Sequence, residues 1–248
     1  MEDGFDTHTT GRRALVTGGA VRVGRSISLA LGRAGYQVGV HYRTSQGDAA
    51  ATVKDLKRTG GRAQAFRADL ADVAQIQGMF EEVAQRLGGI DLLVNSAAIF
   101  PRSDTMTLSA EDWDRVFEIN TRAPFLCAQQ AARRMGAGSS IVNITDTGAD
   151  EAWPSYVPYV ASKAALVSLT RGLARAWAPE VRVNAVAPGP VLLPDGESSE
   201  SEERLAAERT VLDRVGTPDD VASAVLYLDR ASYVTGEVIR VDGGHHLK

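Results

Sequence analysis

The sequence predicts an α/β protein with a mainly parallel β-sheet that carries helices on both faces. Two observations support this fold class. Short apolar segments alternate with longer segments of helical periodicity along the chain, which is the pattern of successive βαβ units. The apolar segments include continuous runs such as Leu92-Leu93-Val94, which are typical of strands buried on both faces. Because crossovers between parallel strands are right-handed, the helices are expected to cover both faces of the sheet.

The first half of the chain alternates regularly between expected strands and helices. Residues 13–17 form a short apolar strand, and residues 26–34 have helical spacing that stops at Gly35. A strand and a helix closed by paired glycines then follow twice, in residues 36–42 and 48–59 and in residues 63–67 and 73–87, before a further strand over residues 91–95.

The second half continues the alternation with longer helices. A helical region over residues 110–135 precedes a strand over residues 140–144, and a helix over residues 156–178 is ended by Pro179. The polar stretch 190–203 is either a disordered excursion or a lid over the substrate, since long loops in compact domains are usually one of the two. The remaining elements are a strand over residues 181–187, a short helix after residue 203, a helix over residues 218–228 and a strand over residues 237–241.

Composition describes a soluble globular protein. The chain has 248 residues, of which 44% are hydrophobic and 23% charged. We expect one domain over residues 12–248 and a flexible polar tail over residues 1–11. The net charge of −4, without a basic block, argues against a nucleic-acid partner. No apolar run is long enough to span a membrane and the N-terminus has no secretion signal, so we expect a cytoplasmic protein without a membrane partner.

Metal-ligating residues are sparse. The single cysteine, Cys127, excludes an internal disulfide and any multi-cysteine metal site. The adjacent pair His245-His246 cannot easily chelate one ion, and we expect this C-terminal segment to pack at a subunit interface. No metal site is therefore predicted.

A glycine-rich turn follows the first strand and leads directly into the first helix. Its sequence is Thr17-Gly18-Gly19-Ala20-Val21-Arg22-Val23-Gly24. Such a turn lets backbone N–H groups and the helix N-terminus face a pyrophosphate. Gly18 suits a tight turn and Gly24 suits close packing of helix on strand, although an ordinary βα turn also needs glycines. The position of the turn after the first strand favours a dinucleotide site.

The end of the second strand indicates which dinucleotide binds. A site for NAD places an acidic residue there to hold the ribose hydroxyls. This chain instead has His41-Tyr42-Arg43-Thr44-Ser45, with no acid before Asp48. Arg43 supplies positive charge and Ser45 a hydroxyl, both suited to a 2′-phosphate, so the pattern predicts NADP(H). The alternative is that Arg43 is an ordinary solvated arginine.

A tyrosine and a lysine near the start of helix 156–178 are the candidate catalytic pair. Tyr159 and Lys163 are four residues apart, which places them on one helical face. An ammonium beside a phenol lowers the pKa of the phenol, which makes a proton donor usable near neutral pH. A Tyr–Lys pair at this spacing is usually exposed on the surface and has no catalytic role. Whether this pair is catalytic therefore depends on the other motifs of the chain.

The motifs along the chain are, in order, Thr17-Gly18 with Gly24, Ala68-Asp69-Leu70, Asn95-Ser96-Ala97-Ala98, Asn120, Tyr159 with Lys163, Pro188-Gly189 and Val241-Asp242-Gly243-Gly244. Together they resemble the short-chain dehydrogenase/reductase family over about residues 12–247. This resemblance implies a Rossmann-type, doubly wound sheet of seven strands, a nicotinamide cofactor, hydride transfer and a homotetramer built through the helices over residues 110–135 and 156–178.

The resemblance also implies roles for individual residues. Asp69 and Leu70 would border the adenine, and Asn95 and Ala97 would lie along the cofactor. Asn120 would shape a proton relay through water to Lys163, which would also bind the nicotinamide ribose. The other residues expected at the cofactor are Gly18, Arg22, Val23, Gly24, His41, Tyr42, Arg43, Ser45, Tyr159, Pro188 and Gly189.

Three positions depart from most of the family and resemble its pteridine reductase branch. Asp146 stands thirteen residues before Tyr159, where most members have a serine that holds a substrate carbonyl. Arg22 replaces the second glycine of the usual turn. Phe100 stands five residues after Asn95, where this branch stacks an aromatic ring on the pterin.

Two further segments point the same way, and one residue does not. The pair His41-Tyr42 is similar to the pteridine reductase branch, and residues 188–195 are similar to bacterial dihydromonapterin reductases. Ala98 stands where the branch often has a serine, which removes one hydroxyl contact to substrate or phosphate.

The substituted residues suit a C=N bond better than a ketone. A carboxylate at Asp146 would repel the alkoxide that forms from a ketone unless it were protonated, whereas it can relay a proton through Tyr159 to a ring nitrogen. Phe100 would stack on the ring, and Arg22 would hydrogen-bond the pterin edge and the cofactor phosphate. The plainer alternatives are a structural acceptor for Asp146, a core residue for Phe100 and a pyrophosphate partner for Arg22.

The sequence therefore predicts an NADPH-dependent reductase of a pterin or dihydropterin, with dihydrofolate as a candidate. Asp146, Tyr159, Lys163 and Asn120 are its expected catalytic residues, and Arg22, Phe100, Asp146 and Tyr159 are expected to bind the substrate. One alternative is a carbonyl reductase that acts on a 3-oxoacyl thioester, a sugar or another ketone. A second is a non-catalytic NADP sensor, against which the intact Tyr159, Lys163 and Asn120 argue.

Overall fold

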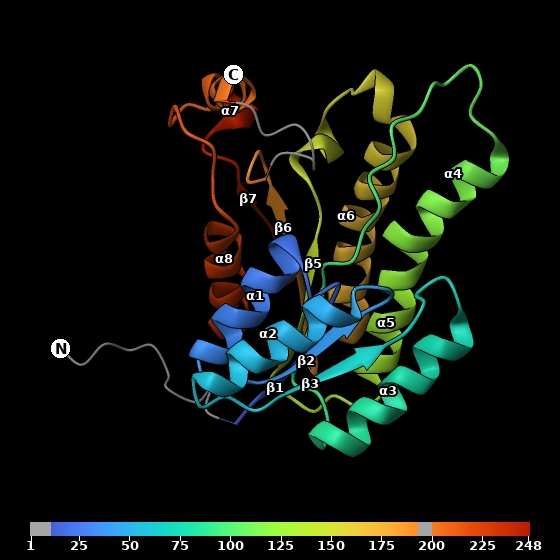
Figure 1. The fold of residues 1–248 in the computed structure, drawn as a ribbon. Coiled ribbons are helices and arrows are strands. Elements are labelled where there is room, and N and C mark those ends of the chain that lie inside the picture. The colour runs from blue at the N-terminus through green and yellow to red at the C-terminus, as the bar shows by residue number, and fades with distance from the viewer. Residues whose placement is uncertain (1–10, 193–199) are drawn as a thin grey trace.

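A seven-stranded parallel sheet lies between two layers of helices in the computed structural model, which describes residues 11–192 and 200–248 (Figure 1). The strand order is β3-β2-β1-β4-β5-β6-β7. Strand β1 (Arg13–Thr17) pairs with β2 (Gln37–Tyr42) on one side and with β4 (Leu92–Asn95) on the other, so the winding reverses there. Ligands of doubly wound sheets bind at such a reversal. The expected fold class is confirmed.

The remaining elements follow the predicted order. The other strands are β3 (Ala63–Arg67), β5 (Ser139–Ile144), β6 (Val181–Pro188) and β7 (Val238–Val241). The helices are α1 (Arg22–Arg33), α2 (Gln46–Arg58), α3 (Val73–Leu87), α4 (Ala110–Phe117), α5 (Ala123–Ala132), α6 (Val157–Trp177), α7 (Glu200–Glu208) and α8 (Pro218–Arg230). Short 3₁₀ turns lie at Thr147–Asp150, Pro154–Tyr156 and His245–Leu247.

The two helical layers are packed by alternate residues of the strands. Ala14 and Val16 of β1 lie in one core cluster with apolar residues of α1, α2 and α8. Leu15, between them, lies in the second cluster with residues of α3, α5 and α6. Both sides of β1 are therefore buried, because successive side chains of a strand point to opposite faces.

Helix ends are satisfied by local side chains. Asp72 caps α3 by accepting hydrogen bonds from the backbone N–H groups of Ala74 and Gln75, and Gly88 ends this helix at a φ of 79°. At α8, Thr217 and Asp220 form a reciprocal capping box around the first turn.

One element differs clearly from the prediction. The single helix expected over residues 110–135 is divided into α4 and α5 by a π-helical turn, Glu118–Arg122. Pro124 explains the interruption, because proline has no N–H to donate to the carbonyl of Asn120 one α-helical turn earlier. The wider turn is closed instead by the N–H of Ala123, which donates to the carbonyl of Glu118.

Two predictions concern residues whose structure is partly outside the described ranges. Of the expected tail, residues 1–10 lie outside them, as do residues 193–199 of the polar stretch 190–203. The short helix expected after residue 203 is α7, which begins earlier, at Glu200. Helix α1 also begins four residues before the predicted residue 26, at Arg22 inside the glycine turn.

Candidate active site

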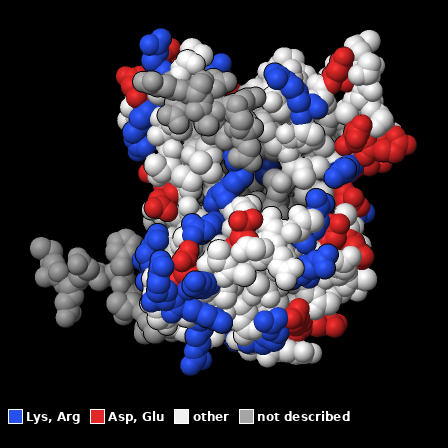
Figure 2. Space-filling model, viewed as in Figure 1, with Lys and Arg blue, Asp and Glu red and all other residues white. Residues whose placement is uncertain are grey.

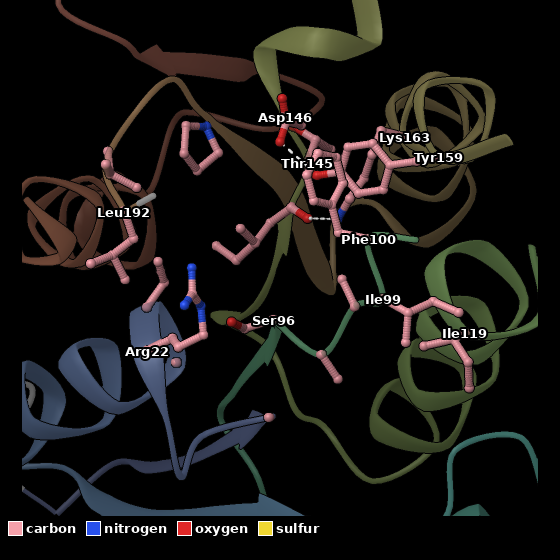
Figure 3. A pocket seen from close by; sticks show the side chains of 18 of the residues that line it. Arg22, Ser96, Ile99, Phe100, Ile119, Thr145, Asp146, Tyr159, Lys163 and Leu192 are labelled. Atoms are coloured by element: carbon pink, nitrogen blue, oxygen red, sulfur yellow. Dashed lines mark hydrogen bonds between the residues drawn. The ribbon is translucent and has the colours of Figure 1, made fainter. Parts of the chain in front are cut away.

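A cavity of about 1020 Å³ opens at the carboxyl ends of the strands. Its walls come from the glycine turn after β1, the ends of β2, β5 and β6, the loops after β4 and β5, and the end of α7. Figure 3 shows Arg22 and Leu192 on one side of the cavity, with Asp146, Tyr159 and Phe100 on the other. Figure 2 shows basic side chains inside the hollow at the centre of this face.

Two glycines shape the turn in the way the sequence predicts. Gly18 has a φ of 62°, and a side chain on it would lie 3.0 Å from the Cα of Ala97. A side chain on Gly24 would collide with the carbonyl oxygen of Gly18. Both positions therefore require glycine, and the turn can approach a ligand closely.

The helix that follows the turn begins without a side-chain cap. Val21, the residue before α1, makes no side-chain cap, and the first turn of α1 carries no acidic residue. Arg22 opens the helix with a φ of 50°, and its side chain extends into the cavity (Figure 3). Uncapped N–H groups, the positive end of the helix dipole and a guanidinium together fit a pyrophosphate.

His41 supports the glycine turn from behind. Its Nδ1 accepts a hydrogen bond of 2.9 Å from the backbone N–H of Gly18, which leaves Nε2 to donate to the carbonyl of Ala68 at 3.1 Å. Burial lowers the pKa of the imidazole to about 4, so His41 is neutral. Its role in this geometry is to hold the turn rather than to supply charge to the cofactor.

Residues expected around the adenosine half line one end of the cavity. Among them are Arg43 and Ser45, which follow β2, while Asp69 and Leu70 follow β3. Arg43 is exposed, and its carbonyl is held by the Nε of Arg67 at 3.3 Å. The other predicted cofactor residues that line the cavity are Gly18, Arg22, Val23, Gly24, His41, Tyr42, Ala97, Tyr159, Lys163, Pro188 and Gly189.

Asn95 is a predicted cofactor residue that the cavity does not include. Its side chain is buried and donates to the carbonyl of Pro124 at 3.2 Å and to Oδ1 of Asn143 at 2.9 Å. Asn95 thus joins β4 to β5 and to the start of α5. Its neighbour Ala97 lines the cavity, and the N–H of Ala97 donates to Thr17.

A short polar contact in the cavity joins Tyr159 and Asp146. The phenol of Tyr159 donates to Oδ2 of Asp146 over 2.6 Å, while Oδ1 of Asp146 accepts from the backbone N–H of Gly148 at 2.8 Å. Burial raises the pKa of Asp146 above its ordinary value. Burial and the neighbouring carboxylate raise the pKa of Tyr159 as well, so the phenol retains its proton.

Lys163 lies beneath this pair. Its Nζ donates to the carbonyl of Ile144 at 2.8 Å and lies 5.7 Å from the centre of the Tyr159 ring. Burial lowers the pKa of Lys163 to about 8. The expectation that Lys163 lowers the pKa of Tyr159 is wrong for this arrangement, because burial and Asp146 raise that pKa. Tyr159 is therefore a protonated donor, which suits reduction.

Asn120 lies in the π-helical turn, outside the cavity lining. Its amide accepts from the N–H of Ile99 at 2.9 Å, donates to the carbonyl of Ile99 at 3.0 Å, and donates to Oγ of Ser162 at 3.1 Å. The side chain thereby fixes the loop after β4 against α6. Its implied part in a water relay to Lys163 remains a prediction.

An aromatic wall stands beside Tyr159. Phe100 stacks parallel on Tyr156 at 4.2 Å and meets Tyr159 edge-on at 4.5 Å. Trp153 lies parallel to Tyr159 at 6.3 Å. Because 42% of Phe100 is exposed, Phe100 is a residue of the cavity wall and not of the hydrophobic core.

Several cavity residues were missed by the sequence reasoning. Tyr156 precedes Tyr159 by three residues at the start of a helix, and that spacing could have identified it. Arg102, Arg209 and His245 carry no local signal, because only the fold brings their segments to the cavity. The structure places His245 at the rim of the cavity, whereas the sequence predicted only that its segment packs at a subunit interface. That packing stays a prediction.

Similar proteins share the whole of this architecture. The family model described as Enoyl-(Acyl carrier protein) reductase matches residues 19–246. The 3-oxoacyl-acyl-carrier-protein reductase FabG of Staphylococcus aureus is 35% identical over 243 residues, which cover 95% of this chain and 98% of the relative.

Solved structures agree with the sequence relatives. A short-chain dehydrogenase from Burkholderia cenocepacia in complex with NADP superimposes with a TM-score of 0.91 at 33% identity, covering 96% of this chain and 99% of the other. The angucycline C-6 ketoreductase LanV with bound NADP has a TM-score of 0.91 at 30% identity, with 97% of each chain covered.

Two further observations concern membranes and metals. Among the described residues, no helix is both long and apolar enough to cross a membrane. The same part of the chain holds no cluster of three or more His, Cys, Asp or Glu residues that could bind a metal ion.

The parallel sheet, the uncapped glycine turn and the Tyr159–Lys163 pair agree with the similar proteins, and we conclude that the chain belongs to the short-chain dehydrogenase/reductase family as an NADP-dependent oxidoreductase.

Proposed function

We propose that this enzyme uses NADPH to reduce a C=N bond in a flat heteroaromatic substrate of the pterin or dihydropterin class. The observation that carries the proposal is the 2.6 Å contact between Tyr159 and Asp146, since a carboxylate occupies the place of the family's usual serine. NADPH would supply the hydride to the ring carbon.

Tyr159 would deliver the proton to the neighbouring ring nitrogen. Its raised pKa keeps the phenol protonated at neutral pH, and Asp146 orients the hydroxyl through their hydrogen bond. Asp146 can also accept hydrogen bonds from amino or imino groups of a pterin, because a carboxylate is an acceptor for such donors. Lys163 would bind the nicotinamide ribose, as the family resemblance implies.

Phe100 and Arg22 would orient the ring. The exposed face of Phe100 favours offset stacking on a flat heterocycle, and it lies beside the proton donor. Arg22 extends from the helix N-terminus into the same cavity, where a guanidinium can bridge the pterin edge and a cofactor phosphate.

A carbonyl reductase is the second candidate, and the similar proteins favour it. The relatives include a 3-oxoacyl-acyl-carrier-protein reductase and a ketoreductase. The opposing argument is local, because an ionised Asp146 repels a developing alkoxide where a serine would stabilise it. Burial, which raises the pKa of Asp146, reduces that repulsion whenever the carboxyl is protonated.

The mouth of the cavity suits an anionic group on either substrate. Arg102 lies over the ring of Tyr156 at 5.6 Å, and Arg209 lines the opening from the end of α7. Neither guanidinium has a carboxylate within ion-pair distance among the described residues. Both the glutamate tail of dihydrofolate and the phosphates of an acyl-coenzyme A thioester could pair with these two guanidinium groups.

The test is a substrate panel with purified enzyme and NADPH. The proposal expects oxidation of NADPH with dihydrobiopterin or dihydrofolate, and little oxidation with acetoacetyl-coenzyme A or simple ketones. Turnover of the ketones alone would establish the second candidate instead. Tight NADPH binding without turnover of any substrate would contradict both candidate functions.

The assembly and compartment are also proposed. We infer a homotetramer that uses the α4–α5 and α6 faces, supported by apolar side chains exposed there, among them Trp113 and Val157. The one cysteine is buried and free, which fits a cytoplasmic enzyme. Light scattering would decide the assembly, with a monomer contradicting the inference.

A further inference from the structure

The C-terminal turn of the chain reaches the rim of the substrate cavity. In this turn, His245–Leu247, the Nδ1 of His245 lies 3.0 Å from the carbonyl oxygen of Arg209 at the end of α7. The Nε2 of the same ring lies 3.4 Å from a carboxylate oxygen of Glu151 in the loop after β5. One imidazole therefore spans two segments that border the cavity from different parts of the chain.

Both partners of His245 are hydrogen-bond acceptors. If Nδ1 carries the proton that the carbonyl of Arg209 accepts, a neutral ring directs the Nε2 lone pair toward the Glu151 carboxylate. Protonation of Nε2 turns that repulsion into an ion pair. The geometry thus matches the imidazolium form, in which Nδ1 donates to the Arg209 carbonyl and the charged ring pairs with Glu151.

Glu151 transmits this contact to the aromatic wall. Its second carboxylate oxygen accepts a hydrogen bond of 2.7 Å from Nε1 of Trp153. The Trp153 ring lies against Gly148, where an added side chain would be 2.7 Å from the ring, and it lies parallel to Tyr159. The position of Trp153 therefore depends on the orientation of Glu151.

We propose that His245, as an imidazolium, is a positioning residue that joins the loop after β5 to the end of α7 and so sets the aromatic wall around the substrate. A salt bridge of 2.6 Å between Arg240 and Asp150 ties β7 to the same loop independently of His245. The proposal rests on the proposed function only in taking this wall as a substrate surface.

Other charged groups near His245 have partners of their own. On its own turn, His246 pairs with Asp242 at 2.6 Å, and Lys248 pairs with Asp213 at 3.5 Å. From α7, the Arg209 side chain faces the cavity, and from the loop, Asp150 is held by Arg240. Glu151 is thus the carboxylate that responds to the charge of His245.

The test follows Trp153 fluorescence between pH 5.5 and 8.5 without any substrate. The chain has three tryptophans, so the Trp153 signal is isolated by subtracting the titration of Trp153→Phe. We expect one transition in the Trp153 signal within this range, because the contact between Nε2 of His245 and Glu151 requires the charged ring. His245→Asn and Glu151→Gln should each abolish it, because the side chains of His245 and Glu151 are partly exposed, at 20% and 31%, and tolerate these changes. His246→Asn is the matched control and should keep it.

A full transition in His245→Asn or in Glu151→Gln would overturn the proposal. With whichever of dihydrobiopterin or acetoacetyl-coenzyme A is turned over, KM should rise about two- to fivefold with pH through the same range, the change that a partly exposed ion pair supports. His245→Arg, which keeps its charge, should hold KM constant with pH. Absence of turnover would contradict the proposed function but would leave the fluorescence test intact.

Discussion

Asp146 and Tyr159 are hydrogen-bonded to each other in the cavity, and we propose that they share the proton chemistry. In this proposal Tyr159 supplies the proton, and Asp146 accepts the hydrogen bond of its hydroxyl over 2.6 Å. Burial raises the pKa of both groups and lowers that of Lys163 to about 8. The low dielectric of the site therefore favours neutral forms, and a proton on the phenol is available throughout the neutral range.

Tyr159→Phe removes the proton donor while keeping the ring. We expect kcat to fall by about two to four orders of magnitude, the usual contribution of a positioned general acid. The dissociation constant of NADPH should change little, because the glycine turn is untouched. Stopped-flow turnover and calorimetric NADPH titration would measure the two quantities, and an active variant would exclude Tyr159 as the donor.

His41 makes stability depend on pH in a defined window. Burial lowers the pKa of His41 from 6.5 to about 4, so the unfolded chain takes up a proton that the folded chain rejects. Its contribution is fully present above pH 6.5 and is lost as the pH falls toward 4, by about 3 kcal/mol at the lower end.

Urea unfolding between pH 4.5 and 7.5 measures this dependence. His41→Asn keeps an acceptor for the Gly18 N–H but cannot titrate, so its stability should vary less with pH than that of the parent. Equal slopes for the two proteins would assign the acid sensitivity to other groups.

At the scale of single elements, the glycine turn is the part that the sequence predicts best. The requirement at Gly24 is local, because its neighbour in space is the carbonyl of Gly18 six residues earlier, whereas Gly18 also meets Ala97 in the loop after β4. The divided helix was missed because apolar periodicity continues through it. Pro124 was the available signal, since its missing N–H leaves the Asn120 carbonyl without an α-helical donor.

Gly24→Ala tests the close approach in this turn. An added methyl group meets the Gly18 carbonyl, which is backbone and cannot rotate away, so we expect a loss of about 1–3 kcal/mol and weaker NADPH binding. Gly78→Ala in α3 is the matched control, because that position is exposed and open. There the change should stabilise the helix by about 0.5–1 kcal/mol. Equal effects at the two positions, measured by thermal unfolding, would contradict this account.

At the scale of the whole molecule, Asp229 joins parts of the chain that are far apart in the sequence. Its carboxylate, which is 1% exposed at the end of α8, accepts hydrogen bonds from Tyr36 and Ser140 and pairs with Arg12 at 3.0 Å. Arg182 donates to the carbonyl of Asp229 at 2.6 Å. These partners come from the first third, the middle and the last third of the sequence.

Asp229→Asn should destabilise the protein by about 3 kcal/mol, the lower end for a broken buried ion pair because the Arg12 side chain is 25% exposed. Asp219→Asn is the control, since Asp219 is 70% exposed and lies 3.9 Å from Arg33. Its effect should stay below about 0.5 kcal/mol. The free energies of unfolding would be measured by urea denaturation. Comparable losses of stability in the two variants would show that the buried ion pair contributes no more than the exposed one.

The same scale explains which site residues the sequence could not predict. Alternation of strands and helices places every βα turn at one edge of a parallel sheet, so the cofactor turn and the Tyr159 pair were predictable together. Arg209 and His245 come to the cavity only through the packing of α7 and the C-terminal turn. Neither has a motif, and their position depends on contacts between segments far apart in the chain.

The central claim about substrate choice is that Asp146, in place of the family's serine, favours a pterin over a ketone. It is tested most directly by kcat/KM for dihydrobiopterin and for acetoacetyl-coenzyme A, measured with NADPH in the parent enzyme and in Asp146→Ser. Asp146→Asn serves as the control that keeps the shape but not the charge. We predict that the parent prefers the pterin and that Asp146→Ser shifts the ratio toward the ketone by about two orders of magnitude, the effect of one well-placed donor on an oxyanion. A parent that prefers the ketone, or a ratio that Asp146→Ser leaves unchanged, would contradict the account.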